Sequence, residues 1–222
     1  VLFALAASVA LVWIWKKIQD SSSGWKIVWN IVLAAIVFGA ALYPLTAASS
    51  KIRDRMSPQA PRTLDGMNYM KTSVYSENGH DMDLGQDYDA IRWMQENIKG
   101  SPVILEANTP EYRWGSRFTI YTGLPSVVGW NWHQRQQRSV LNVDVVQPRV
   151  DEIGKIYNSM DQLEVTEFLK KYNVRYIILG QLEKAFYPPE GLVKFELWKD
   201  KLWKEVYQSK DTHIYEVITN AQ

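Results

Sequence analysis

The pattern of apolar and charged residues divides the chain sharply near residue 50. Residues 1–15 form an uncharged run that is followed at once by Lys16 and Lys17, and residues 27–48 form a second, longer uncharged run. An α-helix of about 20 apolar residues is long enough to cross the hydrocarbon core of a bilayer. The pattern therefore predicts two transmembrane helices, the first of them truncated, joined by a short polar loop at residues 16–26.

Two other interpretations of these runs compete with membrane spans. A signal peptide needs a basic segment before its apolar run and a small-residue cleavage site after it, and the first run has neither. A buried helix of a soluble domain is the alternative for the second run. Trp25, Trp29 and Tyr43 lie near its ends, where amphipathic rings favour the headgroup level, and this favours a membrane span.

The orientation of the two spans does not follow from charge. The loop between them carries three lysines, which favour the cytoplasmic side. Four basic residues follow the second span and weigh against that assignment: Lys51, Arg53, Arg55 and Arg62.

The rest of the chain alternates between helical and strand-like patterns. Residues 49–86 are rich in proline and glycine among polar residues and read as an extended juxtamembrane segment. Apolar residues at helical spacing predict helices at 87–98 and 163–172. Each is followed by an apolar run typical of a buried strand, at 103–106 and 174–180. Helix and buried strand in this order indicate an α/β domain.

Three more short strands are expected near the C-terminus, and the alternation of the last one is typical of a partly exposed sheet edge. They are expected at residues 193–197, 203–207 and 213–218.

Charge and residue content exclude several function classes. The chain has 25 basic and 24 acidic residues, so it lacks the excess basic charge that nonspecific nucleic-acid binding requires. It has no cysteine, which excludes disulfides and thiolate chemistry. His80, His133 and His213 are far apart and lack metal-ligand spacing, so no metal site is predicted from them, and a cation held by carboxylates is the alternative.

Residues 106–138 concentrate the side chains that a binding pocket uses. Arginines, acids, tryptophans and a histidine lie there among turn signals, and burying such charges in a core is costly unless they are paired. Indole rings stack on the apolar faces of sugars, and guanidinium groups match phosphate oxygens. We therefore expect a polar recognition pocket in this segment.

Six residues of the segment are candidate substrate-binding residues: Glu106, Arg117, Trp130, Trp132, His133 and Arg138. Glu106 ends a predicted strand, where ligand sites gather in α/β sheets. Arg117 precedes a Phe-Thr-Ile-Tyr strand pattern, from which it could present a fork to phosphate. The two tryptophans and His133 could stack on a sugar ring and donate to its hydroxyls.

Each candidate has a structural alternative. Arg117 could instead form a salt bridge to Glu106 or Glu111, and the aromatic residues could pack in a core or against a membrane domain. Arg138 could lie on a solvated helix face. Glu183 follows the strand at 174–180 and could approach the same crevice.

Four ordered motifs resemble the C-terminal part of the YYY-type polytopic membrane proteins. They are TLDGMNYM at 63–70, DYDAIRWMQENIKGSPVILEA at 87–107, SRFTIYTGLPSVVGWNWHQRQQR at 116–138 and LKKYNVRYIILGQLEKAFYP at 169–188. The resemblance covers nearly all of residues 50–222. Those proteins are themselves similar to the GT-C glycosyltransferases, which include oligosaccharyltransferase catalytic subunits and lipid-linked mannosyltransferases.

The resemblance implies the C-terminal portion of an integral membrane glycosyltransferase that takes sugar from a polyprenyl-phosphate-linked donor. The α/β domain would lie on the extracytoplasmic side and contribute acceptor or donor recognition. The expected partners are membrane lipid, a lipid-linked sugar and an upstream transmembrane domain of the same protein, with no nucleic acid. The alternative function is a noncatalytic, membrane-anchored binding or assembly module.

GT-C enzymes commonly carry their catalytic acid in the first extracytoplasmic loop, far upstream of their last spans. We therefore expect the catalytic residues outside this sequence and no turnover from this part alone. No cofactor is expected in this part, and a divalent cation is possible in the full protein.

The expected architecture is thus of the α/β class. Two N-terminal transmembrane helices precede an extracytoplasmic α/β domain with a small mixed sheet. The expected segments are 1–15, 16–26, 27–48, 49–86 and 87–222.

Overall fold

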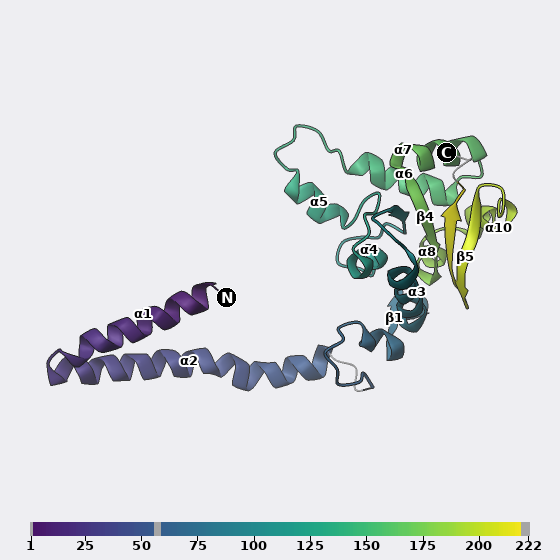
Figure 1. Cartoon of the computed structure of the whole chain (residues 1–222). Coiled ribbons are helices and arrows are strands. Elements are labelled where there is room, and N and C mark those ends of the chain that lie inside the picture. The colour runs from purple at the N-terminus through teal and green to yellow at the C-terminus, as the bar shows by residue number, and fades with distance from the viewer. Residues whose placement is uncertain (1, 56–58, 219–222) are drawn as a thin grey trace. The chain divides into compact units, whose positions relative to one another are not determined.

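The computed structural model describes residues 2–55 and 59–218, which fall into two compact units. The first unit consists of two long helices, α1 (Leu2–Gln19) and α2 (Ser23–Arg55). In Figure 1 they run antiparallel, joined by a tight turn. The second unit is a mixed α/β domain, as the sequence predicts.

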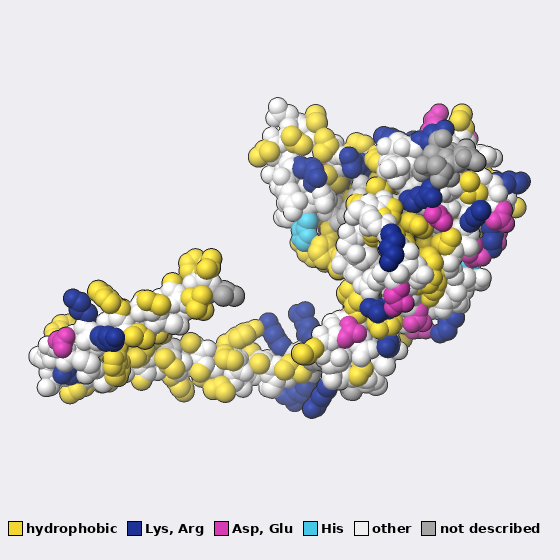
Figure 2. All heavy atoms as spheres, in the orientation of Figure 1, with side chains coloured by type: hydrophobic (Ala, Val, Ile, Leu, Met, Phe, Trp, Pro, Cys, Tyr) yellow, Lys and Arg dark blue, Asp and Glu magenta, His cyan; other side chains and the backbone are white. Residues whose placement is uncertain are grey.

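The two helices of the first unit expose apolar side chains all round. No described residue of either helix is buried, and hydrophobic side chains follow both helices along their length in Figure 2. The mean hydropathy of an 18-residue window is 1.4 in α1 and 2.1 in α2. By length and composition both helices can cross a membrane, and a signal sequence near the N-terminus would have the same character.

Both helices extend further than the apolar runs that predict them. The polar loop expected at 16–26 shrinks to a turn between Gln19 and Ser23, because Lys16 and its neighbours are good helix formers. At its other end α2 continues to Arg55, into the segment expected to be extended. Arg53 and Arg55 occupy its last turn, where cations interact favourably with the helix dipole.

The remainder of the segment expected to be extended, residues 59–86, contains regular structure. A 3-10 turn, η1 (Asn68–Thr72), precedes an antiparallel hairpin of β1 (Val74–Glu77) and β2 (His80–Asp83). Asn78 and Gly79 form the hairpin turn, and both have positive φ. An Asn-Gly pair is the preferred sequence for such a turn, so this hairpin was readable from the sequence.

A four-stranded mixed sheet in the order β3-β4-β6-β5 forms the centre of the α/β unit. β3 (Val103–Leu105) runs parallel to β4 (Val174–Leu179). β6 (Thr212–Val217) pairs antiparallel with both β4 and β5 (Trp203–Ser209). The strand expected at the sheet edge, residues 213–218, is therefore interior.

Helices cover both faces of the sheet, and β4 supplies apolar side chains to both layers. Ile177 and Leu179 join the core beneath α6 (Gln147–Asn158) and α7 (Gln162–Tyr172). Ile178 points the other way, into the core beneath α3 (Leu84–Asn97). This alternation is the period of two that a strand imposes, and burial of each such side chain contributes about 1.5–3 kcal/mol.

Side-chain caps fix where two of these helices begin. The Asp161 carboxylate accepts the N–H of Leu163 at 2.8 Å and starts α7. The Asp83 carboxylate accepts the N–H of Gly85 at 2.9 Å, so α3 begins at Leu84, earlier than the helix expected at 87–98. A carboxylate in this position satisfies a backbone N–H that the helix itself leaves free.

The prediction of a strand at residues 193–197 is wrong. Two short helices, α9 (Pro189–Leu192) and α10 (Lys194–Leu197), occupy this region. Leu192 and Phe195 are buried while Val193 and Leu197 are exposed, which is helical spacing and not the alternation of a strand. The buried Lys194 ammonium donates to the carbonyl oxygens of Tyr157 and Gly191, at 2.9 and 2.7 Å, and holds both helices against α6.

Candidate functional site

The six predicted site residues separate into a buried pair and a surface group. Arg117 and Glu106 lie in the interior of the α/β unit, and the exposed fraction of Arg117 is 1%. Trp130 and Trp132 are 45% and 44% exposed, with His133 partly exposed beside them. Arg138 lies further along the same chain segment and is exposed. The two groups therefore lie in different environments.

Arg117 is bound on all sides by carboxylates. Its Nε lies 2.7 Å from Oδ2 of Asp87, on α3. Its Nη2 and Nη1 donate to the two carboxylate oxygens of Glu183, on α8 (Gln181–Phe186), at 2.9 and 3.2 Å. Its Nη1 also lies 3.8 Å from Glu106, so the salt bridge considered as the alternative for Arg117 is present.

Glu106 determines the local structure around Arg117. Its two carboxylate oxygens accept the backbone N–H groups of Phe118 and Thr119, at 3.0 and 3.1 Å. These N–H groups belong to the first turn of α4 (Arg117–Thr122), where a helix has no backbone acceptor for them. Residues 118–121, which carry a strand-like pattern, consequently form a helix.

Burial and charge act against each other in this cluster. Burial raises the pKa of Glu106, and the positive charge of Arg117 offsets only part of that effect. Burial also acts to raise the pKa of Glu183, but the Arg117 charge and hydrogen bonds outweigh it and hold that pKa below its ordinary value. The pKa of Arg117 is raised, because the charges of Asp87 and Glu183 overcome the effect of burial.

The cluster holds both ends of the loop at residues 107–116. Glu106 precedes this loop and Arg117 follows it, and both are fixed in the interior. Within the loop, Trp114 Nε1 donates to Oδ2 of Asp87 at 2.7 Å. A Cβ at Gly115 would lie 2.2 Å from Oγ1 of Thr109, so only glycine fits this close approach.

An aromatic cleft lies between this loop and the start of α5 (Asn131–Gln137). We use this name for the depression lined by Thr109, Pro110, Glu111, Tyr112, Trp130, Asn131, Trp132 and His133. Trp130 Nε1 donates to the carbonyl of Gly115 at 3.2 Å, which connects the two walls. The His133 ring meets Trp130 and Tyr112 edge-on, with centroids 5.2 and 6.0 Å apart.

The shape of the aromatic cleft suits a ring that lies flat on the surface. Its enclosed volume is about 10 Å³, too small to surround a ligand. Tyr112 is 79% exposed, and together with the two half-exposed tryptophans it presents stacking surfaces. Within the described residues, Asn131 Oδ1 is buried without a hydrogen-bond partner and Nδ2 donates to Asn108 at 3.2 Å.

The structure thus brings together three of the six predicted residues in the cleft, namely Trp130, Trp132 and His133. Arg117 and Glu106 lie behind the loop that forms one wall, and Arg138 lines a different cavity. Whether any of the six binds a ligand stays a prediction.

The sequence did not single out two residues that lie beside the candidate site, Asp87 and Tyr112. Asp87 shares the buried face of α3 with Ile91 and Met94, at helical spacing, and a carboxylate on such a face indicates a buried cation. No pattern in the sequence around Tyr112 indicates that its ring lines a cleft. Glu183, expected to approach the crevice, reaches the Arg117 cluster.

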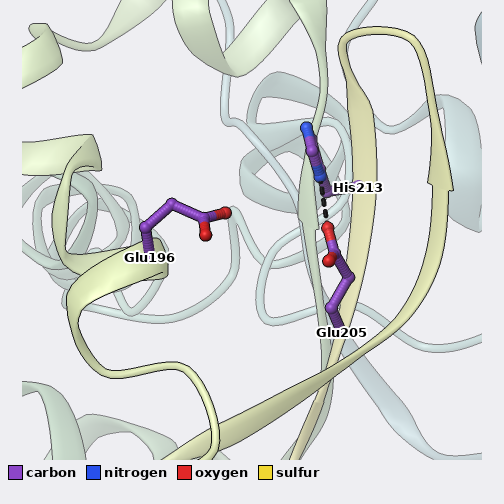
Figure 3. A group of neighbouring side chains, drawn as sticks. All are labelled: Glu196, Glu205 and His213. Carbon is purple, nitrogen blue, oxygen red and sulfur yellow. Dashed lines mark hydrogen bonds and ion pairs between the residues drawn. The ribbon is translucent and has the colours of Figure 1, made fainter.

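One group of side chains elsewhere in the unit has the composition of a metal site. Figure 3 shows Glu205 and His213 on the β5–β6 hairpin with Glu196 of α10 opposite. His213 Nδ1 lies 2.5 Å from Glu205 Oε1. The Lys199 ammonium bonds Glu205 and lies 3.9 Å from Glu196, so a cation already neutralises these carboxylates. The expectation of no metal in this part stays a prediction.

No family model and no curated protein matches the sequence. Among solved structures, the chain is similar to the C-terminal globular domain of oligosaccharyltransferase from Archaeoglobus fulgidus, with a TM-score of 0.39 and 14% sequence identity. The similarity covers 65% of this chain and 99% of that one.

Replacing Arg117 with Met should destabilise the α/β unit strongly. The substitution leaves three buried carboxylates without their cation, a change that costs about 3–5 kcal/mol. Arg92→Met is the matched control, because Arg92 forms an exposed pair with Glu96 at 3.0 Å that contributes only about 0.5 kcal/mol. Denaturant unfolding of the full chain in detergent, followed by near-UV circular dichroism, measures both. Equal stability of the two variants would contradict a structural role for Arg117.

The stability gap between wild type and Arg117→Met should narrow in acid. The pKa of Glu183 lies below its ordinary value of 4.5, so its stabilising contribution is present above that pH and is lost as the pH falls. Without Arg117 the buried carboxylates bind protons more readily, and protonation relieves their unpaired charge. Repeating the unfolding measurement from neutral pH down to well below pH 4.5 tests this, and a gap that widens in acid would exclude it.

Proposed function

We propose that this chain is the membrane-anchored C-terminal part of a glycosyltransferase similar to the GT-C class. In this proposal the α/β unit lies on the extracytoplasmic side. Its aromatic cleft binds the sugar of an acceptor or of a polyprenyl-phosphate-linked donor. The cleft supplies recognition, and the catalytic groups belong to upstream parts of the protein.

The aromatic cleft is the observation that carries this proposal. Sugar rings have apolar C–H faces that stack on indole and phenol rings, and hydroxyl groups that need hydrogen-bond partners. Trp130, Trp132 and Tyr112 offer the first, and the ring nitrogens of His133 offer the second. Each well-placed aromatic contact contributes about 0.5–1.5 kcal/mol. Such a shallow surface suits one or two residues of a longer glycan.

The first unit supports the membrane part of the proposal. α1 and α2 are long and apolar enough to cross a bilayer, and basic residues lie at both ends of the longer one. Two crossings return the chain to the side from which it started. The turn at Asp20–Ser22 and the α/β unit would then lie on opposite sides of the membrane.

A noncatalytic assembly module is the second candidate, and one observation favours it. The segment after α5 exposes several apolar side chains, among them Val140 at 87% exposure together with Leu141 and Val143. Exposed apolar clusters often mark protein contacts. The upstream coding sequence separates the two candidates. About ten further spans with an acidic first extracytoplasmic loop would support the enzyme, whereas their absence would support the module.

Neutral oligosaccharides should bind the full chain, and Trp132→Ala should weaken that binding. Loss of one stacking surface of about 1 kcal/mol lowers the affinity roughly fivefold. A glycan array of mannose- and glucose-containing oligosaccharides, followed by calorimetry on any that bind, measures this in detergent solution. Trp25→Ala, an exposed tryptophan in α2, is the control and should bind like wild type. No binding by wild type, or equal losses in both variants, would contradict the proposal.

The chain has no cysteine, so single cysteines report its topology cleanly. Ser139→Cys, in an exposed position of the α/β unit, should react with a membrane-impermeant maleimide in intact cells. Ser22→Cys, in the turn between α1 and α2, should react only after permeabilisation. The reverse pattern would place the α/β unit in the cytoplasm, and labelling of both in intact cells would exclude two membrane crossings.

A further inference from the structure

A second, larger cavity lies beside the aromatic cleft. Its volume is about 320 Å³, within the range of small-ligand sites. It is lined by Thr119 of α4, residues 125–129, Gln134 of α5, Arg138 just after that helix, residues 145–146 and Arg149 of α6. We call it the arginine cavity, because Arg138 and Arg149 both line it.

The charge in the arginine cavity is unbalanced. Its lining includes two arginines and no carboxylate. Neither guanidinium forms a salt bridge to any residue that the structure describes, whereas the neighbouring Arg135 pairs with Asp144 at 3.2 Å. Two unpaired cations that face one concave space attract an anion into it.

Both arginines keep donors for a ligand. Arg149 Nη1 makes a long contact of 3.4 Å with the carbonyl of Val127, and its guanidinium lies 5.5 Å from the centre of the Tyr172 ring. Among the residues that the structure describes, Arg138 Nη1 donates only to Gln134, at its backbone carbonyl and its side-chain oxygen. Each guanidinium has five N–H donors, so these contacts leave several unused.

Thr119 also lines the same cavity. Its Oγ1 is buried and has no hydrogen-bond partner among residues 2–55 and 59–218. A buried hydroxyl without a partner costs about 1–3 kcal/mol, and rotation of the Thr119 side chain toward an anion in the cavity would relieve that cost.

We propose that the arginine cavity is a binding site for a phosphate or pyrophosphate group, held by Arg138, Arg149 and the hydroxyl of Thr119. Guanidinium forks match phosphate oxygens in pairs, and two of them neutralise the charge of one such group.

The position of the cavity connects it to the aromatic cleft. Gly129 and Gln134 line the arginine cavity, and their chain neighbours Trp130 and His133 line the cleft. A glycan with phosphate next to its sugar could therefore contact both. This assignment of the ligand rests on the proposed function, whereas the binding of an inorganic anion does not.

Calorimetric titration of the full chain in detergent with inorganic pyrophosphate tests the site. Wild type should bind, and Arg138→Gln and Arg149→Gln should each weaken binding about tenfold or more, since a charge-assisted contact is lost. Arg92→Gln, an exposed arginine on α3, should bind like wild type. Equal weakening in all three variants would show nonspecific charge attraction and would overturn the proposal.

A second arm separates a lipid phosphate from a soluble one. The full chain is titrated with nanodiscs that contain or lack a polyprenyl monophosphate. Loss of lipid binding in Arg149→Gln assigns the site to a lipid-linked phosphate, and pyrophosphate binding alone assigns it to a soluble one. No binding of either probe would overturn the proposal.

Thr119→Val and Trp132→Ala complete the test. Thr119→Val keeps the shape of the side chain and removes the hydroxyl, and it should weaken pyrophosphate binding severalfold while Trp132→Ala leaves it unchanged. Failure of the glycan test with pyrophosphate binding intact would refute the proposed function and leave the anion site standing. An unchanged thermal unfolding transition in each variant shows that the loss is not a folding defect.

Discussion

The guanidinium of Arg117 meets three carboxylates in the interior of the α/β unit, and four elements of the fold must converge to make this contact. Asp87 comes from α3, Glu106 follows β3, Arg117 begins α4 and Glu183 belongs to α8. A buried charge without its partners costs several kcal/mol, so this arrangement tolerates little displacement. The loop from 107 to 116 is fixed at both ends by the cluster, and that loop forms one wall of the aromatic cleft.

The position of one wall of the aromatic cleft therefore depends on charges that are buried. The cluster fixes both ends of the loop, and Trp114 within the loop donates to Asp87 of the cluster. Trp130 donates to the loop carbonyl of Gly115, and the absence of a side chain at Gly115 allows close packing against Thr109. A rigid support of this kind limits the entropy that aromatic side chains lose when a ligand stacks on them. The arginine cavity uses the other end of α5 and the start of α6, so both candidate sites share one helix.

Local patterns in the sequence predicted the fold class, the two long apolar helices, the helices α3 and α7 and the four strands of the central sheet, because each depends on periodicity over a few residues. Patterns failed where a distant group decided the structure. Residues 118–121 resemble a strand but form a helix because Glu106 caps them. Arg117 joins Asp87 and Glu183 across 30 and 66 residues of chain, and no local spacing reveals such partners. The residue types at Trp130, Trp132 and His133 indicated a binding role from the sequence. Tyr112 and Arg149 come to line their cavities only through the tertiary fold, and no local pattern indicates this.

The most direct test of this account is the exchange of the Arg117 side-chain N–H protons with solvent. Nuclear magnetic resonance of the full chain in micelles, labelled with ¹⁵N at arginine and assigned with Arg117→Lys, resolves the Nε–H signal. A guanidinium that is 1% exposed and hydrogen-bonded to Asp87 and Glu183 should keep that proton for far longer than the exposed Arg92 keeps its own. Exchange of the Arg117 proton as fast as that of Arg92 would contradict the buried cluster and the support it gives to the aromatic cleft.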